Sequence, residues 1–539
     1  MASRRDELNA YTFAKRRTVA AFLQPSASGS EEGAPRPLRA VLPGVITAAV
    51  ILAAFGAWGM FKPTAPKGWD TPGDHVIVGK DSTTRYVVLT TKVDGKPQTR
   101  LHPVLNLASA RLLLDPSKAK VVQVEDKVLD AGKIPRGPII GIPYAPDRLP
   151  APAEAGKAKR WAVCQQPGGN GKGVQTAAFV LADREAHLMD DGRRLSDSQA
   201  LYVQSGGPGR ARYLVDAAGM KYKFPDGTAD ARTMTNALVG GSAVPQQVTE
   251  EWLATLGSGD DLAFPELPGA RAGTAAGVKG LASTDDKVGM VLKAVTGAGV
   301  QHYLVLPGKV VPVSDFVAWL MISSPATDRL DMHGKAHEVD MQSINPDRTP
   351  FKGDAKWPQK KTERINEVRA SAASTASAAG ADGARDTVCS VLRSVDARGR
   401  QTLSTWAGTG FPVDITASGT SAYVTPGTGL LYTQAQGRQT TAGGALFLVT
   451  DTGLRYAVQA NGDSDAAQPS PGPGASSGQS ESPGEGGSAT ADGRPAPSQA
   501  QARLGYADVV PATVPIAWSE FLSKGPRLDS NAARQPQGS

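Results

Sequence analysis

The sequence predicts an α+β protein with an N-terminal cytoplasmic helix, one transmembrane helix and an elongated extracytoplasmic head. Three observations carry this prediction. Residues 41–61 form an uncharged apolar run, the only two cysteines both follow that run, and two long stretches of the remaining chain resemble each other. We expect the head to contain four αβ repeats around a discontinuous, mostly β central domain.

The apolar run at 41–61, VLPGVITAAVILAAFGAWGMF, is long enough to cross a bilayer core as one helix. Seven Arg or Lys residues precede it, whereas only Lys62 and Lys67 follow it closely. Because cytoplasmic flanks carry an excess of basic residues, we expect a single-pass protein of the cell membrane with residues 1–40 in the cytoplasm and the large C-terminal part outside. A cleaved signal peptide is the alternative, which small residues near the end of the run leave open.

The composition favours a head rich in strands and turns and argues against one class of partner. The chain of 539 residues contains 60 Gly and 40 Pro, which is typical of many turns and unlike a helical bundle. Its net charge of +7 is spread along the sequence, and aromatic residues are not interleaved with basic clusters. We therefore expect no nucleic acid partner.

The two cysteines, Cys164 and Cys389, lie on the predicted outer side of the membrane, where a disulfide can persist. We predict a bridge between them, and the chain-entropy model gives a closure of this length about 5 kcal/mol of stabilisation. Two buried free thiols are the alternative. A bridge would place the two segments side by side and make the chain between them an insertion.

Two stretches of the head align with each other. The sequence YLVDAAGMKY at 213–222 matches FLVTDTGLRY at 447–456 without gaps, and each reads as a strand, a Gly turn and a second strand. Large residues between 238 and 262 then match residues between 504 and 528 at a constant offset of 266, including Trp252 with Trp518. We interpret the two stretches as copies of one repeat.

Two shorter hairpins resemble this repeat more weakly. Tyr86 and Tyr303 each begin a short apolar strand that is followed by a Gly turn and then by Pro103 or Pro312. We count them as two further repeats, with a chance similarity of β-hairpins as the alternative. The later long copy also contains an insertion at 461–498, which is rich in Ser, Gly, Pro and Ala and is predicted to be a disordered loop.

These observations divide the chain into segments. We predict a cytoplasmic basic segment at 1–40, a transmembrane helix at 41–61, repeat 1 at 74–130, the central domain at 131–200 and 385–440, repeat 2 at 201–268, repeat 3 at 285–345, and repeat 4 at 441–530 with its insertion at 461–498.

No motif predicts a catalytic, cofactor or metal site. A P-loop needs Ser or Thr after its Gly-Lys pair, and none of the Gly-Lys pairs of this chain has one. His333 and His337 have the spacing of a helical metal pair, but Gly334 would weaken the helix and the Glu of an HExxH motif is missing. We expect a solvated pair. The one GxSxG match, GASSG at 474–478, falls in the Ser-, Gly- and Pro-rich segment 461–498, so no nucleophile elbow is predicted. The sequence therefore predicts no enzyme.

Several segments resemble EccB, the single-span core subunit of actinobacterial type VII secretion systems. They are the YTF and KRR runs at 11–17, the apolar run, LHPVLNLASARL at 101–112, PRGPIIGIPYAPD at 135–147 and GPRL at 525–528. The chain departs from the family at Tyr144, where relatives commonly have a smaller residue, at 461–498, and in a long polar stretch after Trp319.

The resemblance implies a structural core component of the type VII secretion membrane complex. It implies a periplasmic or cell-wall-facing head of four repeats around a central domain held by a disulfide, and homo-oligomers that pair as dimers within a larger ring. The repeats of the family resemble a cell-wall-binding subunit of a phage lysin. The alternative function is thus a membrane-anchored module that binds peptidoglycan, and a nucleotide or other hydrolase is a distant third.

The N-terminal segment is expected to contact an EccC-like membrane ATPase beside EccD- and EccE-like subunits. Leu8, Tyr11, Val19 and Phe22 fall on one side of a helix, with Lys15 intruding. The predicted partner-binding residues are Leu8, Tyr11, Phe13, Lys15, Arg16, Arg17 and Phe22. The alternative is a basic helix that lies on anionic lipid.

Overall fold

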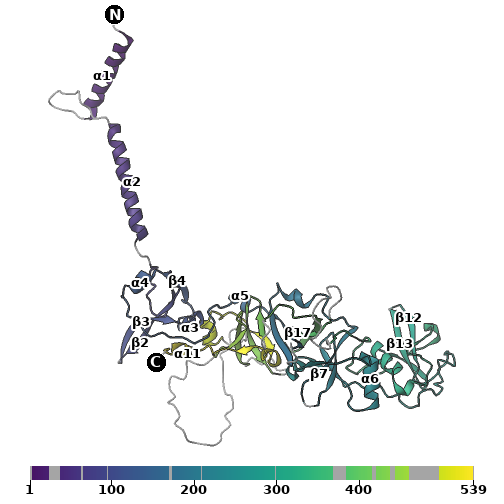
Figure 1. Cartoon of the computed structure of the whole chain (residues 1–539). Helices are drawn as coiled ribbons and strands as arrows, with labels where there is room; N and C mark the ends of the chain where they lie inside the picture. Colours follow the sequence, from purple (N-terminus) through teal and green to yellow (C-terminus); the bar gives the residue numbers. More distant parts are fainter. Residues whose placement is uncertain are drawn as a thin grey trace, which may run out of the picture. The chain divides into compact units, whose positions relative to one another are not determined.

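The computed structural model describes residues 3–23, 37–61, 65–93, 95–168, 173–207, 209–297, 299–367, 384–415, 421–436, 444–459 and 497–537 (Figure 1). The predicted disordered insertion at 461–498 falls, except for its last two residues, outside the described residues. The chain forms two compact units. The smaller comprises Met1–Trp69, Ile77–Thr83 and Val122–Pro135, and the larger comprises Asp70–Val76, Thr84–Val121 and Arg136–Ser539.

The fold is a sheet-rich α+β fold, as predicted. The strands of the described residues form five separate sheets, and most of the helices are short. The finer division into four repeats and a central domain stays a prediction.

Two long helices begin the chain. They are α1 (Arg4–Leu23) and α2 (Pro37–Phe61), and α2 includes the predicted transmembrane run. Among the residues that the structure describes, no helix is both long enough and apolar enough to cross a membrane.

The remaining elements of the first part of the chain are short. They are β1 (His75–Gly79), β2 (Arg85–Val93), β3 (Lys96–Val104), α3 (Leu107–Leu112), β4 (Lys120–Val124), α4 (Asp126–Asp130) and α5 (Pro152–Ala155). In the smaller unit, the Asp126 carboxylate at the start of α4 accepts hydrogen bonds from the backbone N–H groups of Asp81 and Ser82 and from the Ser82 hydroxyl. These bonds favour the ionised carboxylate and lower the pKa of Asp126.

The two hairpins with weaker sequence similarity share one arrangement. The first is β2–β3, and the second belongs to the sheet β14-β13-β12-β15, formed by β12 (Val291–Thr296), β13 (Gly299–Leu306), β14 (Lys309–Val313) and β15 (His337–Glu338). Tyr86 lies opposite Pro103, and Tyr303 lies opposite Pro312. A capped helix follows each hairpin, with Asn106 at the start of α3 and Ser314 at the start of α8 (Asp315–Ile322).

The two long copies form sheets with the same strand order. The first sheet has the order β10-β7-β8-β9-β11, with β7 (Gln199–Ser205), β8 (Arg212–Asp216), β9 (Met220–Lys223), β10 (Gln246–Val248) and β11 (Gly257–Ser258). The second has the order β23-β20-β21-β22-β24, with β20 (Gly429–Ala435), β21 (Leu446–Thr450), β22 (Leu454–Ala457), β23 (Ala512–Pro515) and β24 (Ser523–Lys524). Their hairpins turn at Gly219 and Gly453, whose φ angles of 74° and 77° favour glycine.

The helices of the two copies also correspond. α6 (Ala229–Val239) and α7 (Glu250–Ala254) follow the first hairpin, and α9 (Gln499–Arg503) and α10 (Ile516–Ser519) follow the second. Gly259 and Gly525 then pass closely over the rings of Tyr222 and Tyr456, so that a Cβ atom would lie 2.2 Å and 2.5 Å from the ring atoms. The sequence match therefore reflects matched packing.

A central sheet joins distant parts of the chain. Its order is β18-β17-β5-β6-β19, with β5 (Arg160–Pro167), β6 (Val174–Leu181), β17 (Thr387–Val395), β18 (Gln401–Gly408) and β19 (Ser421–Val424). β5 and β17 are antiparallel neighbours although more than two hundred residues separate them. The elements not yet given are β16 (Glu363–Arg364), α11 (Ser530–Arg534) and the 3-10 helices Ala186–Met189, Pro325–Thr327 and Met341–Ser343.

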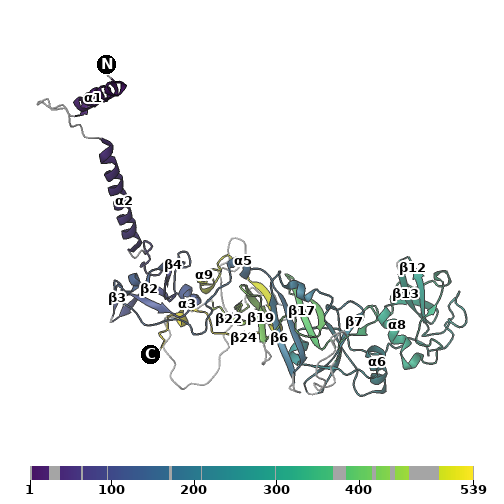
Figure 2. The same ribbon diagram turned by 45° about the horizontal axis from the view of Figure 1, so that its top comes forward.

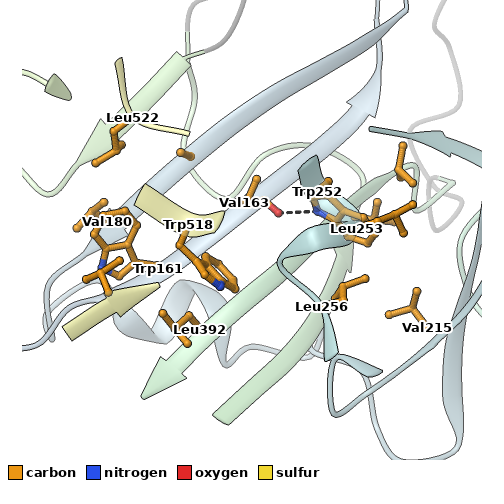
Figure 3. Packing of buried hydrophobic residues seen from close by; sticks show 14 of the residues in the cluster. Trp161, Val163, Val180, Val215, Trp252, Leu253, Leu256, Leu392, Trp518 and Leu522 are labelled. Carbon is orange, nitrogen blue, oxygen red and sulfur yellow. Dashed lines mark hydrogen bonds between the residues drawn. The ribbon is translucent and has the colours of Figure 1, made fainter. Parts of the chain in front are cut away.

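The largest hydrophobic cluster of the described residues combines side chains from the central sheet and from both copies, and Figure 2 shows β17 and β6 between β7 and β22. Trp252 and Trp518 are fully buried in this cluster (Figure 3). The Trp252 indole N–H donates to the carbonyl of Val163 at 2.9 Å, and that of Trp518 donates to Oε1 of Gln401 at 3.3 Å. Each copy thus anchors one tryptophan against the central sheet.

Candidate interaction sites

Cys164 and Cys389 form a disulfide in the structure. They lie directly opposite each other on β5 and β17, with their Cα atoms 4.0 Å apart and their sulfur atoms bonded at 2.05 Å. Both side chains are fully buried beside Phe179 and Trp406. A disulfide at this place fixes the register of the two strands at the middle of the central sheet.

Two of the segments that carry the resemblance, 101–112 and 135–147, lie against each other and are called the two family motifs below. Residues 136–142 run parallel to β3, with bridges between Leu101 and Arg136 and between Val104 and Ile140. Beyond the strand, the side-chain amide of Asn106 donates to the carbonyl of Ile142 at 2.7 Å. On the other side, the C-terminal residues 536–537 bond to 139–141. The second motif therefore runs alongside β3 and is joined to it by isolated β-bridges.

His102 of the first motif packs so closely on residue 137 of the second motif that this position requires glycine. His102 is buried, and its Nδ1 lies 3.0 Å from the carbonyl oxygen of Pro138. A Cβ atom at residue 137 would lie 2.2 Å from the imidazole Cε1 atom, so that only glycine fits without displacement. Burial disfavours the charged imidazolium and lowers the pKa of His102. The histidine therefore has a structural role.

Three apolar side chains remain exposed around this motif pair, namely Leu105, Ile139 and Tyr144. Tyr144 is 88% exposed and has a φ angle of 61°, which is uncommon for any residue other than glycine. The sequence shows a larger residue at 144 than relatives commonly have, but it does not predict the backbone conformation of Tyr144.

The predicted partner-binding residues of the N-terminal segment all lie on α1. Their side chains are exposed, and those of Leu8, Tyr11, Phe13 and Phe22 are large and apolar. Lys15, Arg16 and Arg17 are exposed on the same helix. The structure thus brings the seven residues together on one element, and their role in binding stays a prediction.

The two histidines considered as a metal pair do not share a helix. His333 lies in a turn with a φ angle of 47°, and His337 begins β15. His337 bonds through Nδ1 to the Asp285 carboxylate at 2.8 Å and through Nε2 to the carbonyl of Asp331 at 3.1 Å. Within the described parts of the chain, no group of three or more His, Cys, Asp or Glu side chains is placed to hold a metal ion.

Comparison with known proteins places the chain in a family. The model described as "Type VII secretion system ESX-1, transport TM domain B" matches residues 1–538. The chain belongs to this EccB family. One relative, named ESX-2 secretion system ATPase EccB2, from Mycobacterium tuberculosis, is 30% identical over 335 residues, which cover 60% of this chain and 59% of the relative. The chain thus spans about three fifths of the length of this relative.

A second relative matches over a longer range. It is named ESX-3 secretion system ATPase EccB3, from Mycolicibacterium smegmatis, and is 28% identical over 448 residues, or 79% of this chain and 77% of the relative.

Two solved structures have a similar fold. A chain of an intact ESX-5 inner membrane complex has a TM-score of 0.54 at 19% identity and covers 100% of this chain and 96% of its own length. The EccB3 dimer from the ESX-3 core complex has a TM-score of 0.51 at 20% identity and covers 85% of this chain and 99% of its own.

Proposed function

We propose that this protein is a structural core subunit of a type VII secretion membrane complex. The observation that carries the proposal is the match of the EccB family model to residues 1–538. Solved chains of similar fold come from ESX membrane complexes and include an EccB dimer, which supports the proposal that this chain also forms dimers within a larger ring.

The proposed topology has the run at 41–61, which lies in α2, as the single membrane span. It rests on the sequence, because no helix of the described residues by itself has the length and apolarity of a span. The run carries no charged residue, and basic residues precede it in excess. This asymmetry supports a cytoplasmic α1 and an extracytoplasmic C-terminal part that contains the Cys164–Cys389 disulfide. In spheroplasts, a protease added outside should degrade the C-terminal part and spare residues 1–40. Digestion of residues 1–40 from outside would refute this orientation.

The proposed role of α1 is to hold the cytoplasmic motor, an EccC-like ATPase, beside EccD- and EccE-like subunits. Leu8, Tyr11 and Phe22 expose large apolar areas, whose burial against a partner gives about 25 cal/mol for each Å². Arg16 and Arg17 add positive charge at the same helix. Such a surface suits a protein contact, and it also suits anionic lipid, which attracts each basic residue by about 1 kcal/mol.

Two charge reversals on the same helix separate these explanations. Arg16→Glu with Arg17→Glu and the control pair Arg4→Glu with Arg5→Glu change the net charge equally. In detergent without lipid, neither pair should change the recovery of the ATPase if α1 only binds lipid, whereas a specific protein contact should be weakened by the pair at 16 and 17 and not by the control pair. The measurement is the amount of ATPase that co-purifies with the tagged protein in detergent without lipid. Equal recovery with all variants and the wild type would make α1 a membrane anchor only.

The proposal assigns no nucleotide hydrolysis to this subunit. The names of the relatives include the word ATPase, but no Gly-Lys pair of this chain is followed by Ser or Thr. Purified protein free of the motor should release no phosphate from ATP. Sedimentation of the protein with purified peptidoglycan, without recovery of a membrane assembly, would instead favour the cell-wall-binding alternative.

A further inference from the structure

The two long stretches that resemble each other in sequence can be compared at equivalent positions. In the first sheet, Val203 of β7 lies opposite Gln246 of β10. In the second sheet, Tyr432 of β20 lies opposite Ala512 of β23. Gln246 and Ala512 are also related by the offset of 266 residues that relates the rest of their segments. The same place at the edge of each sheet thus holds a carboxamide in one copy and a methyl group in the other.

Gln246 fills the space between its edge strand and the central sheet. Its side chain is 1% exposed. The amide nitrogen donates to the carbonyl of Asp386 at 2.7 Å, and the amide oxygen accepts from the side chain of Asn366 at 3.2 Å. In the first copy, the chain itself therefore supplies a buried carboxamide at this place.

A cleft of about 320 Å³ lies at the corresponding place in the second copy, where Ala512 ends at its Cβ atom. The lining includes Trp161, Leu392, Leu430 and Val514, which are buried and apolar apart from the indole N–H. Val510, 55% exposed, also lines the cleft. The cleft thus combines an apolar interior with an exposed side chain.

Trp161 lines the cleft and carries a polar group left unpaired in the described part of the chain. The residue is 1% exposed, and its buried indole N–H has no hydrogen-bond partner among the residues that the structure describes. In the same hydrophobic cluster, the buried indole N–H groups of Trp252 and Trp518 both have hydrogen-bond acceptors. An unsatisfied buried donor costs about 1–3 kcal/mol. A ligand that places an oxygen on this N–H would recover that stabilisation.

The charges around the cleft favour a neutral ligand over an anion. Lys159 is buried, and its ammonium group is 3.2 Å from the carboxylate of Glu154. The guanidinium group of Arg393 is 2.7 Å from the carboxylate of Asp190. Both cations that line the cleft are thus neutralised by carboxylates of the chain itself, and an additional carboxylate would be desolvated without a free cation beside it.

We propose that this cleft binds the carboxamide side chain of a Gln or Asn residue in an extended segment of a partner protein. The amide oxygen accepts the Trp161 N–H, and the aliphatic stem packs against Leu392 and Val514. The segment is extended because the cleft follows residues 510–514, which include most of the edge strand β23, and edge strands pair readily with extended chains. This inference is independent of the proposed role in secretion.

The test uses the full chain labelled with 5-fluorotryptophan and followed by 19F NMR. The chain has eight tryptophans, and Trp161→Phe identifies the resonance of residue 161. The probe is N-acetylglutamine methylamide, with N-acetylglutamate methylamide as the charged analogue of the same length. We expect the neutral probe to shift the Trp161 resonance selectively and the charged probe to bind more weakly.

Ala512→Gln supplies the carboxamide from the chain itself, as Gln246 does in the first copy. We expect this variant to shift the Trp161 resonance without any probe and to lose the response to the probe. Ala507→Gln, at an exposed position outside the cleft lining, should respond as the wild type does. If Ala512→Gln does not fold, Trp161→Phe provides the second test, because saturation transfer from protein to probe should be lost with the N–H.

Three results would overturn the proposal. They are no shift of the Trp161 resonance up to the solubility limit of the neutral probe, equal binding of the glutamate analogue, and undiminished binding to a folded Ala512→Gln variant.

Discussion

Replacement of Gly137 by alanine tests the interpretation that the two family motifs form one packed unit. The added Cβ atom would lie 2.2 Å from Cε1 and 2.4 Å from Nδ1 of His102, far inside the 3.0 Å that real Cβ contacts respect. The imidazole is 4% exposed and hydrogen-bonded to the carbonyl of Pro138, so that its movement breaks existing contacts. Overpacking of this kind costs about 1–3 kcal/mol.

A double-mutant cycle shows whether the cost arises from this contact. His102→Ala removes the ring. In the His102→Ala background, Gly137→Ala should therefore lose most of its effect on stability, with a coupling energy of about 1–2 kcal/mol. Hydrogen exchange of β3 under native conditions measures the local free energy of opening. Gly192→Ala is the matched control, because its Cβ would meet no atom within 4 Å. Additive effects of the two substitutions, or a Gly137→Ala effect as small as the control, would refute the interpretation.

Three further predictions concern the disulfide, a histidine and a strained tyrosine. Cys164→Ser and Cys389→Ser should each lower the free energy of unfolding by up to about 5 kcal/mol, and the double variant should cost little more, because either change breaks the same link; two free thiols titrated in the unreduced protein would contradict this. The hydrogen bond to Asp285 raises the pKa of His337 above 6.5. The protonated histidine therefore stabilises β15 at low pH, and this contribution is lost as the pH rises through the raised pKa. Hydrogen exchange of β15, corrected for the intrinsic rate, should increase over that pH range in the wild type but not in Asp285→Asn. Tyr144→Gly should raise the thermal midpoint slightly, since relief of the left-handed conformation is worth about 1 kcal/mol against a smaller entropic cost; a clear decrease would show that the exposed ring makes stabilising contacts.

The two hairpins with similar sequences could be predicted because their determinants are local. A Gly turn between two apolar strands leaves a direct trace in the sequence, and Gly219 and Gly453 occupy equivalent turns. The buried Trp252 and Trp518 kept the same spacing because each fills a pocket against the central sheet. The pairing of β5 with β17 followed only from the two cysteines, since nothing else in the sequence connects strands so far apart.

Other strand pairings have no recognisable pattern in the sequence. Residues 136–142, which are predicted to belong to the central domain, pair with β3 through isolated bridges, and such bridges impose no alternating pattern on the sequence. β20 begins within the segment assigned to the central domain and pairs with β21. β16 joins β7 from a polar stretch by only two residue pairs. The cleft at Ala512 depends on how short this side chain is, which only comparison with Gln246 in three dimensions reveals.

The position of the disulfide determines how the chain would carry mechanical load. A bridge between residues 164 and 389 lets tension along the chain pass from β5 to β17 through two sulfur atoms. Residues 165–388, which contain the first long copy and the sheet of β12 to β15, would then be excluded from the load-bearing backbone. With the bridge reduced, the same tension would have to be resisted by the hydrogen bonds between β5 and β17, and their rupture would release the whole intervening length of chain.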